Sequence, residues 1–183
     1  MRINFGKNGI LIIHNYVVKN LVAVDGVNYV GMIQGSIDRA YTTVNGKEVF
    51  PHIMDKAGSI LYSMVRFHPF ADGCKRTGLL TAYLFLFYNG YYLQIPQDSA
   101  KFLEGIAASE DPDEENELKV ILWIRKHCVI DAVTILTNAF MTMLTLAGLN
   151  IERYTSYLLK NDALLDELRE KFRDGNLEES NRL

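Results

Sequence analysis

The chain has 183 residues, of which 49% are hydrophobic and 22% are charged, and its formal net charge is −3. This composition is typical of one soluble globular domain, with or without a helical appendage, and it lacks the basic footprint of nucleic-acid-binding proteins. Two cysteines cannot form a disulfide framework, and the short N-terminal apolar run does not resemble a signal peptide or membrane anchor, so we expect a cytoplasmic protein without nucleic-acid or membrane partners.

Two helices are predicted near the start of the chain, over residues 11–21 and 29–40. The Asp25-Gly26 pair between them is typical of a turn. The helices are therefore expected to be separated by a loop.

A small hairpin is predicted from the stretch YTTVNGKEVFP, in which two short β-prone runs flank Asn45-Gly46. This dipeptide is a strong hairpin signal, because both central residues of a type I′ turn need positive φ. We expect the hairpin to cover residues 41–50 and to be closed by Pro51.

A third helix is predicted between Ala57 and Val65, where apolar residues recur at helical spacing and leave one buried face. It has to end at His68, because the residue before Pro69 is disfavoured in the right-handed α region. The next helical segment, GLLTAYLFLFYNG over residues 78–90, is apolar on nearly every side. We expect it to run through the middle of the core.

The second half of the chain is also predicted to be mainly helical. YYLQI, residues 91–95, is expected to be a short strand, and residues 99–108 a helix. Six acids between Glu110 and Glu117 predict a solvated loop, and the chain reads as helical again from Leu118.

One apolar segment, residues 129–149, has the length of a membrane span, but Asp131, Asn138 and four threonines interrupt it. A buried helix in a bundle, or one that faces a partner subunit, is the preferred interpretation. A stripe from Tyr154 to Phe172 predicts a C-terminal helix. The predicted architecture is all-α with one hairpin.

The stretch HPFADGCKRTG, residues 68–78, holds an imidazole, a carboxylate, a thiol and two cations between two apolar helices. Lys75, Arg76 and Thr77 begin the second helix, whose first N–H groups have no partners inside it and form a natural anion site. Two cations in a first turn are costly unless an anion is present. We therefore predict a phosphate site, with Arg76 as a fork of donors and Lys75 as a point charge.

Three further residues extend this prediction to phosphoryl or nucleotidyl transfer. Gly73 would let the backbone approach a ligand, and Asp72 beside a polyphosphate is placed to hold Mg²⁺. His68, held in an extended conformation by Pro69, would take a proton from an attacking hydroxyl. A structural interpretation stays open for each, since a lone histidine at a helix end or an Asp-Gly pair is more often part of the fold.

HPFADGCKRTG resembles the Fic/Doc signature, H-x-F-x-[D/E]-[G/A]-N-[G/K]-R, and its K-R-T-G ending is similar to the Doc (death-on-curing) branch. The similarity extends from Gly31 to Leu93, about a third of the chain. It implies an all-α Fic fold, a helical bundle with a small β-hairpin flap. It also implies a Fic/Doc-like core domain over residues 1–110, followed by a C-terminal helical extension over residues 118–183.

The resemblance implies a role for each position of the motif. His68 would be the general base for a target hydroxyl, Phe70 would anchor the loop in the core, and Asp72 would bind Mg²⁺. The phosphates of the nucleotide would be bound by Gly73, Cys74, Lys75 and Arg76. The hairpin corresponds to the flap, which aligns a target segment by strand-like pairing; its target-binding residues would be Thr42, Thr43 and Val44.

The family transfers part of a nucleotide, usually AMP from ATP, to a hydroxyl of another protein. Its Doc branch transfers the γ-phosphate, which makes Doc a protein kinase, and Doc proteins are toxins held in check by an antitoxin. AMP-transferring members usually carry a second Arg three positions after the first, where this chain has Leu79. The resemblance therefore implies a kinase that uses ATP or another nucleoside triphosphate with Mg²⁺, and AMP transfer is the alternative.

Cys74 stands where the family has Asn. Since a thiol is a weak donor, a catalytically weakened member that acts as a binding or regulatory module is a second alternative. Beside Lys75 and Arg76 at a helix N-terminus, the pKa of this thiol is expected to fall, and a thiolate would repel phosphate. A neutral thiol packed against the core is the competing interpretation, and a Cys-His nucleophilic enzyme using His68 is a third function.

Some family members are silenced by an inhibitory helix with the pattern [S/T]-x-x-x-E-[G/N]. Here Glu104-Gly105 and Glu115-Asn116 supply the ending, but the residues four positions earlier, Ala100 and Asp111, are neither Ser nor Thr. Control is therefore expected from a separate antitoxin protein.

Overall fold

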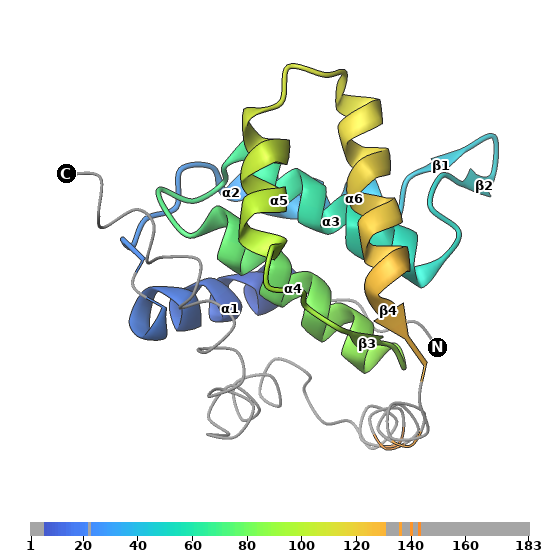
Figure 1. The fold of residues 1–183 in the computed structure, drawn as a ribbon, viewed down its shortest axis with the longest axis horizontal. Helices are drawn as coiled ribbons and strands as arrows, with labels where there is room; N and C mark the ends of the chain where they lie inside the picture. Colours follow the sequence, from blue (N-terminus) through green and yellow to red (C-terminus); the bar gives the residue numbers. More distant parts are fainter. Residues whose placement is uncertain (1–5, 22, 131–135, 137–139, 141–142, 144–183) are drawn as a thin grey trace.

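The computed structural model describes residues 6–21, 23–130, 136, 140 and 143. Over this part of the chain it contains six helices and two small antiparallel sheets (Figure 1). The helices are α1 (Lys7–Asn20), α2 (Val30–Ala40), α3 (Ile53–Phe67), α4 (Cys74–Tyr88), α5 (Ser99–Ala108) and α6 (Asp113–His127). The strands are β1 (Thr43–Val44), β2 (Lys47–Glu48), β3 (Tyr92–Leu93) and β4 (Cys128–Val129). The predicted all-α fold with a small hairpin is confirmed.

Helices α3 and α4 form the centre of the molecule. Residues 77–86 of α4 are all buried, as its apolar sequence predicts, and α3 is buried from Asp55 to Val65. Helix α3 packs against α2, α4 and α6. The approach of α6 requires Gly58, since a Cβ there would lie 2.7 Å from Ile121 Cγ1 and 2.8 Å from Ile121 Cα.

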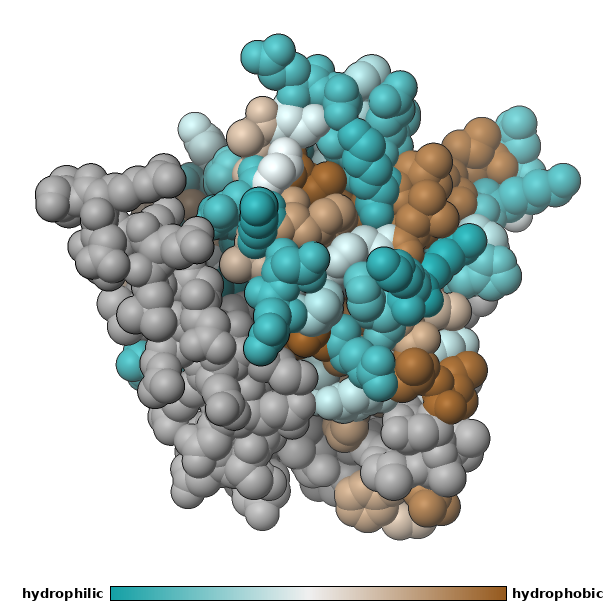
Figure 2. Space-filling view, viewed as in Figure 1, coloured by the Kyte–Doolittle hydropathy of each residue, from teal (hydrophilic) through white to brown (hydrophobic). Residues whose placement is uncertain are grey.

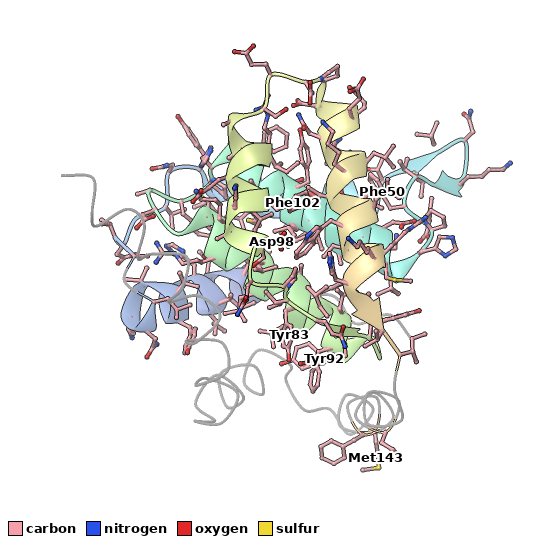
Figure 3. All side chains as sticks on the ribbon, viewed as in Figure 1. Phe50, Tyr83, Tyr92, Asp98, Phe102 and Met143 are labelled. Carbon is pink, nitrogen blue, oxygen red and sulfur yellow. The ribbon has the colours of Figure 1, made fainter. Side chains whose placement is uncertain are left out.

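The chain after α4 covers the core with α5 and α6. The Phe102 ring of α5 stacks on Trp123 of α6, with centroids 5.2 Å apart, and β3 pairs with β4. Tyr83 of α4 meets Tyr92 of β3 edge to face (Figure 3). The chain therefore stays part of the folded core as far as β4.

The division into a core over residues 1–110 and an extension over 118–183 stays a prediction, because most of residues 131–183 lie outside the described residues. The helix predicted from Tyr154 to Phe172 also falls outside them, as does most of the segment 129–149. In the part of the chain that is described, no helix is long and apolar enough to cross a membrane.

The acidic stretch 110–117 is a correction to the sequence analysis. It was predicted to be a solvated loop, but α6 already begins at Asp113, directly after Pro112. Three acids in the first turn of α6 are favourable there, because negative charge stabilises a helix N-terminus. Acids that follow a proline are a helix start signal, and this signal outweighed the polarity of the stretch.

Glu117 shows why this part of the chain is ordered. It is 6% exposed, and its carboxylate accepts two hydrogen bonds from Arg39 of α2, at 2.9 and 2.6 Å. It accepts a third from Ser59 Oγ of α3 at 2.8 Å. One buried carboxylate therefore links α6 to α2 and α3.

The hairpin forms at the predicted dipeptide, with Asn45 at φ 51° and Gly46 at φ 74°. It is fixed to α3 through Lys56, whose fully buried Nζ donates to the Ala40 carbonyl at 3.0 Å and lies 3.5 Å from the Glu48 carboxylate. Two hairpin valines, at positions 44 and 49, are 58% and 46% exposed, and Figure 2 shows apolar surface on this side of the molecule. The hairpin is thus anchored at its base and exposed at its tip.

We expect the Glu117→Ala change to lower the free energy of unfolding by about 2–3 kcal/mol, since it removes the shared acceptor of three hydrogen bonds. Urea unfolding followed by circular dichroism measures the change. Glu110→Ala, which removes an exposed acid in the loop before α6, is the control and should shift stability by less than about 0.5 kcal/mol. Equal losses in the two variants would contradict the linking role of Glu117.

Candidate functional site

The loop between α3 and α4, residues 68–73 and hereafter the motif loop, begins with an unusual backbone conformation. His68 has φ 46° and ψ 59°, so it is left-handed and not extended as predicted. Pro69 excludes only the right-handed α region for this residue, and the left-handed region ends the helix more sharply. Such a conformation costs about 1–2 kcal/mol in a residue other than glycine and is concentrated at functional sites. The His68 side chain is exposed.

The segment before α2 holds the motif loop in place. Asn28 donates from its side chain to the Phe70 carbonyl at 3.0 Å and to the His68 carbonyl at 3.4 Å. Its backbone N–H donates to the Pro69 carbonyl at 2.9 Å, and the Ala71 N–H donates to the Gly26 carbonyl at 2.9 Å. Three successive carbonyls of the motif loop, those of residues 68–70, are thus bound by a segment about 40 residues earlier in the chain.

Asp72 is ionised at neutral pH. Its carboxylate accepts hydrogen bonds from its neighbour Gly73 N–H at 2.5 Å and from Val24 N–H at 3.1 Å, and Arg76 lies 3.4 Å away. Burial acts to raise the pKa of Asp72, but these hydrogen bonds and the Arg76 charge outweigh it, so the pKa of this carboxyl lies below its usual value. With 42% of its side chain exposed, Asp72 remains open to a ligand.

The two cations of the motif already have acidic partners. Arg76 pairs with Asp72 and also donates to the Leu21 carbonyl. Lys75 forms an exposed ion pair with Glu104 of α5, at 3.3 Å. Sequence analysis identified Glu104 only as half of an inhibitory pattern, and nothing in its spacing predicted contact with Lys75. An anion arriving at this turn would therefore replace internal partners.

Gly73 precedes the first turn of α4, residues 74–77, in a left-handed conformation with φ 74°. A Cβ at this position would lie 3.1 Å from Val17 Cγ1 and 3.2 Å from Ala23 Cβ. The left-handed backbone thus favours glycine, and a side chain at this position would also crowd Val17 and Ala23. On this side of Gly73, Val17 and Ala23 of the protein itself make the close approach that was expected of a ligand.

Cys74 differs from the sequence prediction. It is 5% exposed, and its thiol donates to the Phe70 carbonyl at 3.3 Å. Burial raises the pKa of the Cys74 thiol, so the expected fall in pKa and the accessible thiolate are both wrong. The reason is that the side chain is packed in the core, where desolvation outweighs the effect of the neighbouring Lys75 charge. The alternative of a neutral thiol packed in the core is the one observed.

Phe70 is 1% exposed and anchors the motif loop in the core as expected. It stacks on the ring of His14 from α1, with centroids 3.8 Å apart and planes at 10°. Nδ1 of His14 also lies 3.1 Å from Thr77 Oγ1. The sequence analysis missed His14, although its position four residues after Ile10 and three before Val17 placed it on the buried face of α1.

The structure does not bring the predicted flap to the motif. Thr42, Thr43 and Val44 are exposed, and their hairpin lies at the N-terminal end of α3, whereas the motif loop lies at its other end (Figure 1). The 15 residues of α3 separate the two by roughly 20 Å. A target held by the hairpin would need about six extended residues to reach His68.

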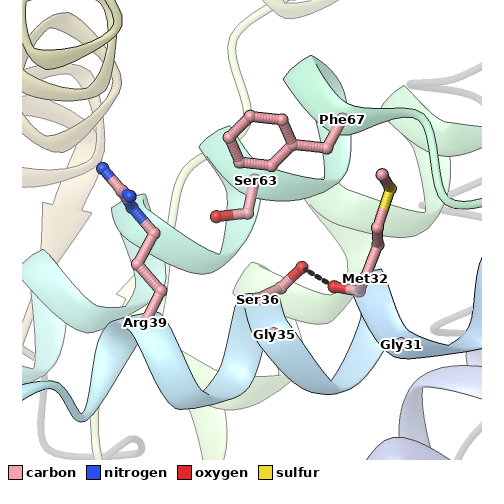
Figure 4. A pocket seen from close by; sticks show the side chains of 7 residues that line it. All are labelled: Gly31, Met32, Gly35, Ser36, Arg39, Ser63 and Phe67. Carbon is pink, nitrogen blue, oxygen red and sulfur yellow. Dashed lines mark hydrogen bonds between the residues drawn. The ribbon is translucent and has the colours of Figure 1, made fainter.

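A groove of about 390 Å³ lies between α2 and α3, along the length of α3 that separates the hairpin from the motif loop (Figure 4). It is mainly apolar, and its last residue on α3, Phe67, directly precedes His68. The lining residues are Gly31, Met32, Gly35, Ser36, Arg39, Ser63 and Phe67.

Comparison with known proteins finds similarity to the same family that the motif resembles. Residues 5–86 match the model of the Fic/DOC family. The protein "Toxin Doc" of Mycolicibacterium smegmatis (strain ATCC 700084 / mc(2)155) is 35% identical over 85 residues, which cover 45% of this chain and 65% of that protein. The match thus spans slightly less than two thirds of this relative. No solved structure matches the chain significantly.

We expect the Cys74 thiol to be alkylated at least about tenfold more slowly in the native chain than in urea, because it is buried and its pKa is raised. The Cys128→Ser variant leaves Cys74 as the one thiol, so that mass spectrometry after iodoacetamide treatment measures it alone. The same reaction in urea gives the reference rate. Equal alkylation rates in the native and unfolded chains would show that the Cys74 thiol is accessible, and would contradict its burial.

Proposed function

Because residues 5–86 belong to the Fic/Doc family and are of its Doc type, we propose that this chain is a protein-modifying enzyme that transfers a phosphoryl group from a nucleoside triphosphate to a hydroxyl of a target protein. One observation carries the proposal. An exposed histidine in a left-handed conformation, His68, begins the six-residue loop that leads into a helix N-terminus bearing an ionised carboxylate and two cations. This is the set of groups that phosphoryl transfer to a hydroxyl needs.

In this proposal the nucleotide phosphates bind at the first turn of α4. Lys75 and Arg76 supply positive charge, and the backbone N–H groups of residues 74–76 have no partners within the helix. Asp72 would hold Mg²⁺, which neutralises phosphate charge when bound. The ionised, half-exposed carboxylate fits that role, but among the described residues no cluster of three His, Cys, Asp or Glu could hold a metal ion. Mg²⁺ would therefore arrive with the nucleotide.

His68 would act as the general base. It accepts the proton of the target hydroxyl as the new O–P bond forms, while the bond from the γ-phosphorus to its bridging oxygen breaks and the nucleoside diphosphate leaves. Histidine is the side chain that enzymes use most often as a general base. Its exposure leaves room for the side chain of a target protein.

Leu79 favours phosphoryl transfer over AMP transfer. The second Arg of AMP-transferring relatives would stand at this position, but Leu79 is 1% exposed in the core face of α4. A cation at this position would be buried. Only Lys75 and Arg76 of the motif can therefore supply positive charge to the nucleotide. Transfer of AMP remains the alternative reaction at the same site.

The second candidate function is a module that binds without transferring. Cys74 favours it, because its thiol donates to the Phe70 carbonyl and leaves the phosphate site without the amide that relatives carry there. In either case we propose a toxin controlled by a separate antitoxin protein, in line with the name of the relative.

The reaction is tested by incubating the chain with a lysate and with ATP labelled at either the α- or the γ-phosphate. We expect γ-label on protein, and loss of labelling when Mg²⁺ is chelated. His68→Ala should slow labelling by roughly 10²–10⁴-fold, the contribution of a general base. The control is His52→Ala, an exposed histidine at the opposite end of α3.

The label distinguishes the candidates. Retention of the α-label would favour AMP transfer, and nucleotide binding with no label on protein would favour the binding module. Equal rates for His68→Ala and the parent chain would remove His68 from the reaction.

We also expect Glu104→Gln to tighten ATP binding by up to about fivefold, because an exposed ion pair is worth at most about 1 kcal/mol and phosphate competes with Glu104 for Lys75. Isothermal titration with ATP and Mg²⁺ measures the affinity, and high salt should reduce the difference. Glu114→Gln makes the same charge change at an exposed site on α6. An affinity gain no larger than in this control would show that Glu104 does not compete with the nucleotide.

A further inference from the structure

His14 contacts the motif at two positions, Phe70 and Thr77, although it lies more than 50 residues away in the sequence. Its ring stacks on Phe70 and its Nδ1 meets Thr77 Oγ1 at 3.1 Å. Its Cε1 lies 3.9 Å from the point where a Cβ of Gly73 would be. One imidazole thus touches the middle of the motif loop and the end of the first turn of α4, and it borders the space that a side chain at the N-cap Gly73 would enter.

The surroundings of His14 favour one chemical form. The side chain is 1% exposed, and its Nε2 is buried without a hydrogen-bond partner. An unpaired donor is rarer in protein interiors than an unpaired acceptor, so the form with the proton on Nδ1 fits best, donating to Thr77. Burial lowers the pKa of His14, against the charges of Asp25 and Asp72, and keeps the ring neutral at pH 7.

We propose that His14 is a positioning residue that fixes the shape of the first turn of α4. This turn is where we propose that the phosphates bind. The role of His14 in nucleotide binding therefore rests on the proposed function. A flat neutral ring is needed for the stack on Phe70, and a ring nitrogen is needed for Thr77; phenylalanine supplies only the first and an aliphatic side chain supplies neither. The Thr77 N–H closes the same turn by donating to the Gly73 carbonyl at 2.8 Å. His14 therefore acts through Thr77 and Gly73, without touching a ligand.

The test compares His14→Phe, Thr77→Val and the double variant with the parent chain. The first keeps a ring for the stack and removes both nitrogens, and the second removes the hydroxyl while His14 remains. Ile13→Val is the control, because it trims a fully buried apolar neighbour on α1 that makes no polar contact with the motif. If His14→Phe does not fold, Thr77→Val tests the same hydrogen bond from its other side.

Two readouts are measured. Hydrogen exchange of the backbone amide at position 77, called Thr77 exchange below, needs no nucleotide, and we expect it to be at least tenfold faster in either single variant than in Ile13→Val. Titration with ATP and Mg²⁺ should give five- to tenfold weaker binding in each single variant. The double variant should bind no more weakly than the weaker single variant, because both changes break one interaction.

Thr77 exchange equal to that of Ile13→Val would overturn the proposal, and so would unchanged nucleotide affinity in variants of a parent chain that binds nucleotide. If the parent binds no nucleotide, the proposed function fails, and Thr77 exchange alone decides whether His14 fixes the turn.

Discussion

Six residues between α3 and α4 have to end one helix and begin another, and the site depends on how the backbone does this. Pro69 keeps His68 out of the right-handed helix region, and His68 takes the left-handed one. Gly73 is left-handed as well and turns the chain into α4. Six residues therefore join the C-terminus of α3 to the N-terminus of α4, so the unpaired polar groups of both helix ends lie close to one loop in the sequence.

Charge at this loop is balanced within the chain. Arg76 is held by Asp72 and the Leu21 carbonyl, and Lys75 by Glu104, so the turn is not an open cationic surface. Phosphate binding at such a site is an exchange of partners. The net gain is smaller than the charges suggest, since each ion pair that forms replaces another. The exposed Lys75 pair is the weaker of the two and the easier to exchange.

Much of the fold follows from local signals in the sequence. Asn45-Gly46 predicts the hairpin, Pro69 predicts the end of α3, and the apolar run after Thr77 predicts the buried helix, because each of these signals acts over a few residues. Residues 113–117 are an exception, because their polarity is typical of a loop although Pro112 and the acids after it begin a helix. The acids there form the beginning of α6.

The site was less predictable than the fold, for a physical reason. The pKa of Cys74 depends on whether its side chain faces the core or the cations, and this is decided by the rotation of α4 about its own axis. Residues 77–86 of α4 are all buried, so no periodicity in its sequence fixes that rotation. The contact of Lys75 with Glu104 depends on how α5 docks, and no local pattern encodes it either.

The contacts that tie the motif loop to the rest of the molecule reach far along the chain. They span 40 residues from Asn28 to His68, 48 from Val24 to Asp72 and 63 from His14 to Thr77. Closing such long loops lowers the entropy of the chain before the favourable contacts have formed. These contacts are therefore expected to form late in folding. The central pair α3 and α4 is adjacent in sequence and can associate earlier. The molecule is therefore expected to acquire its scaffold first and a shaped site only when its first 28 residues dock.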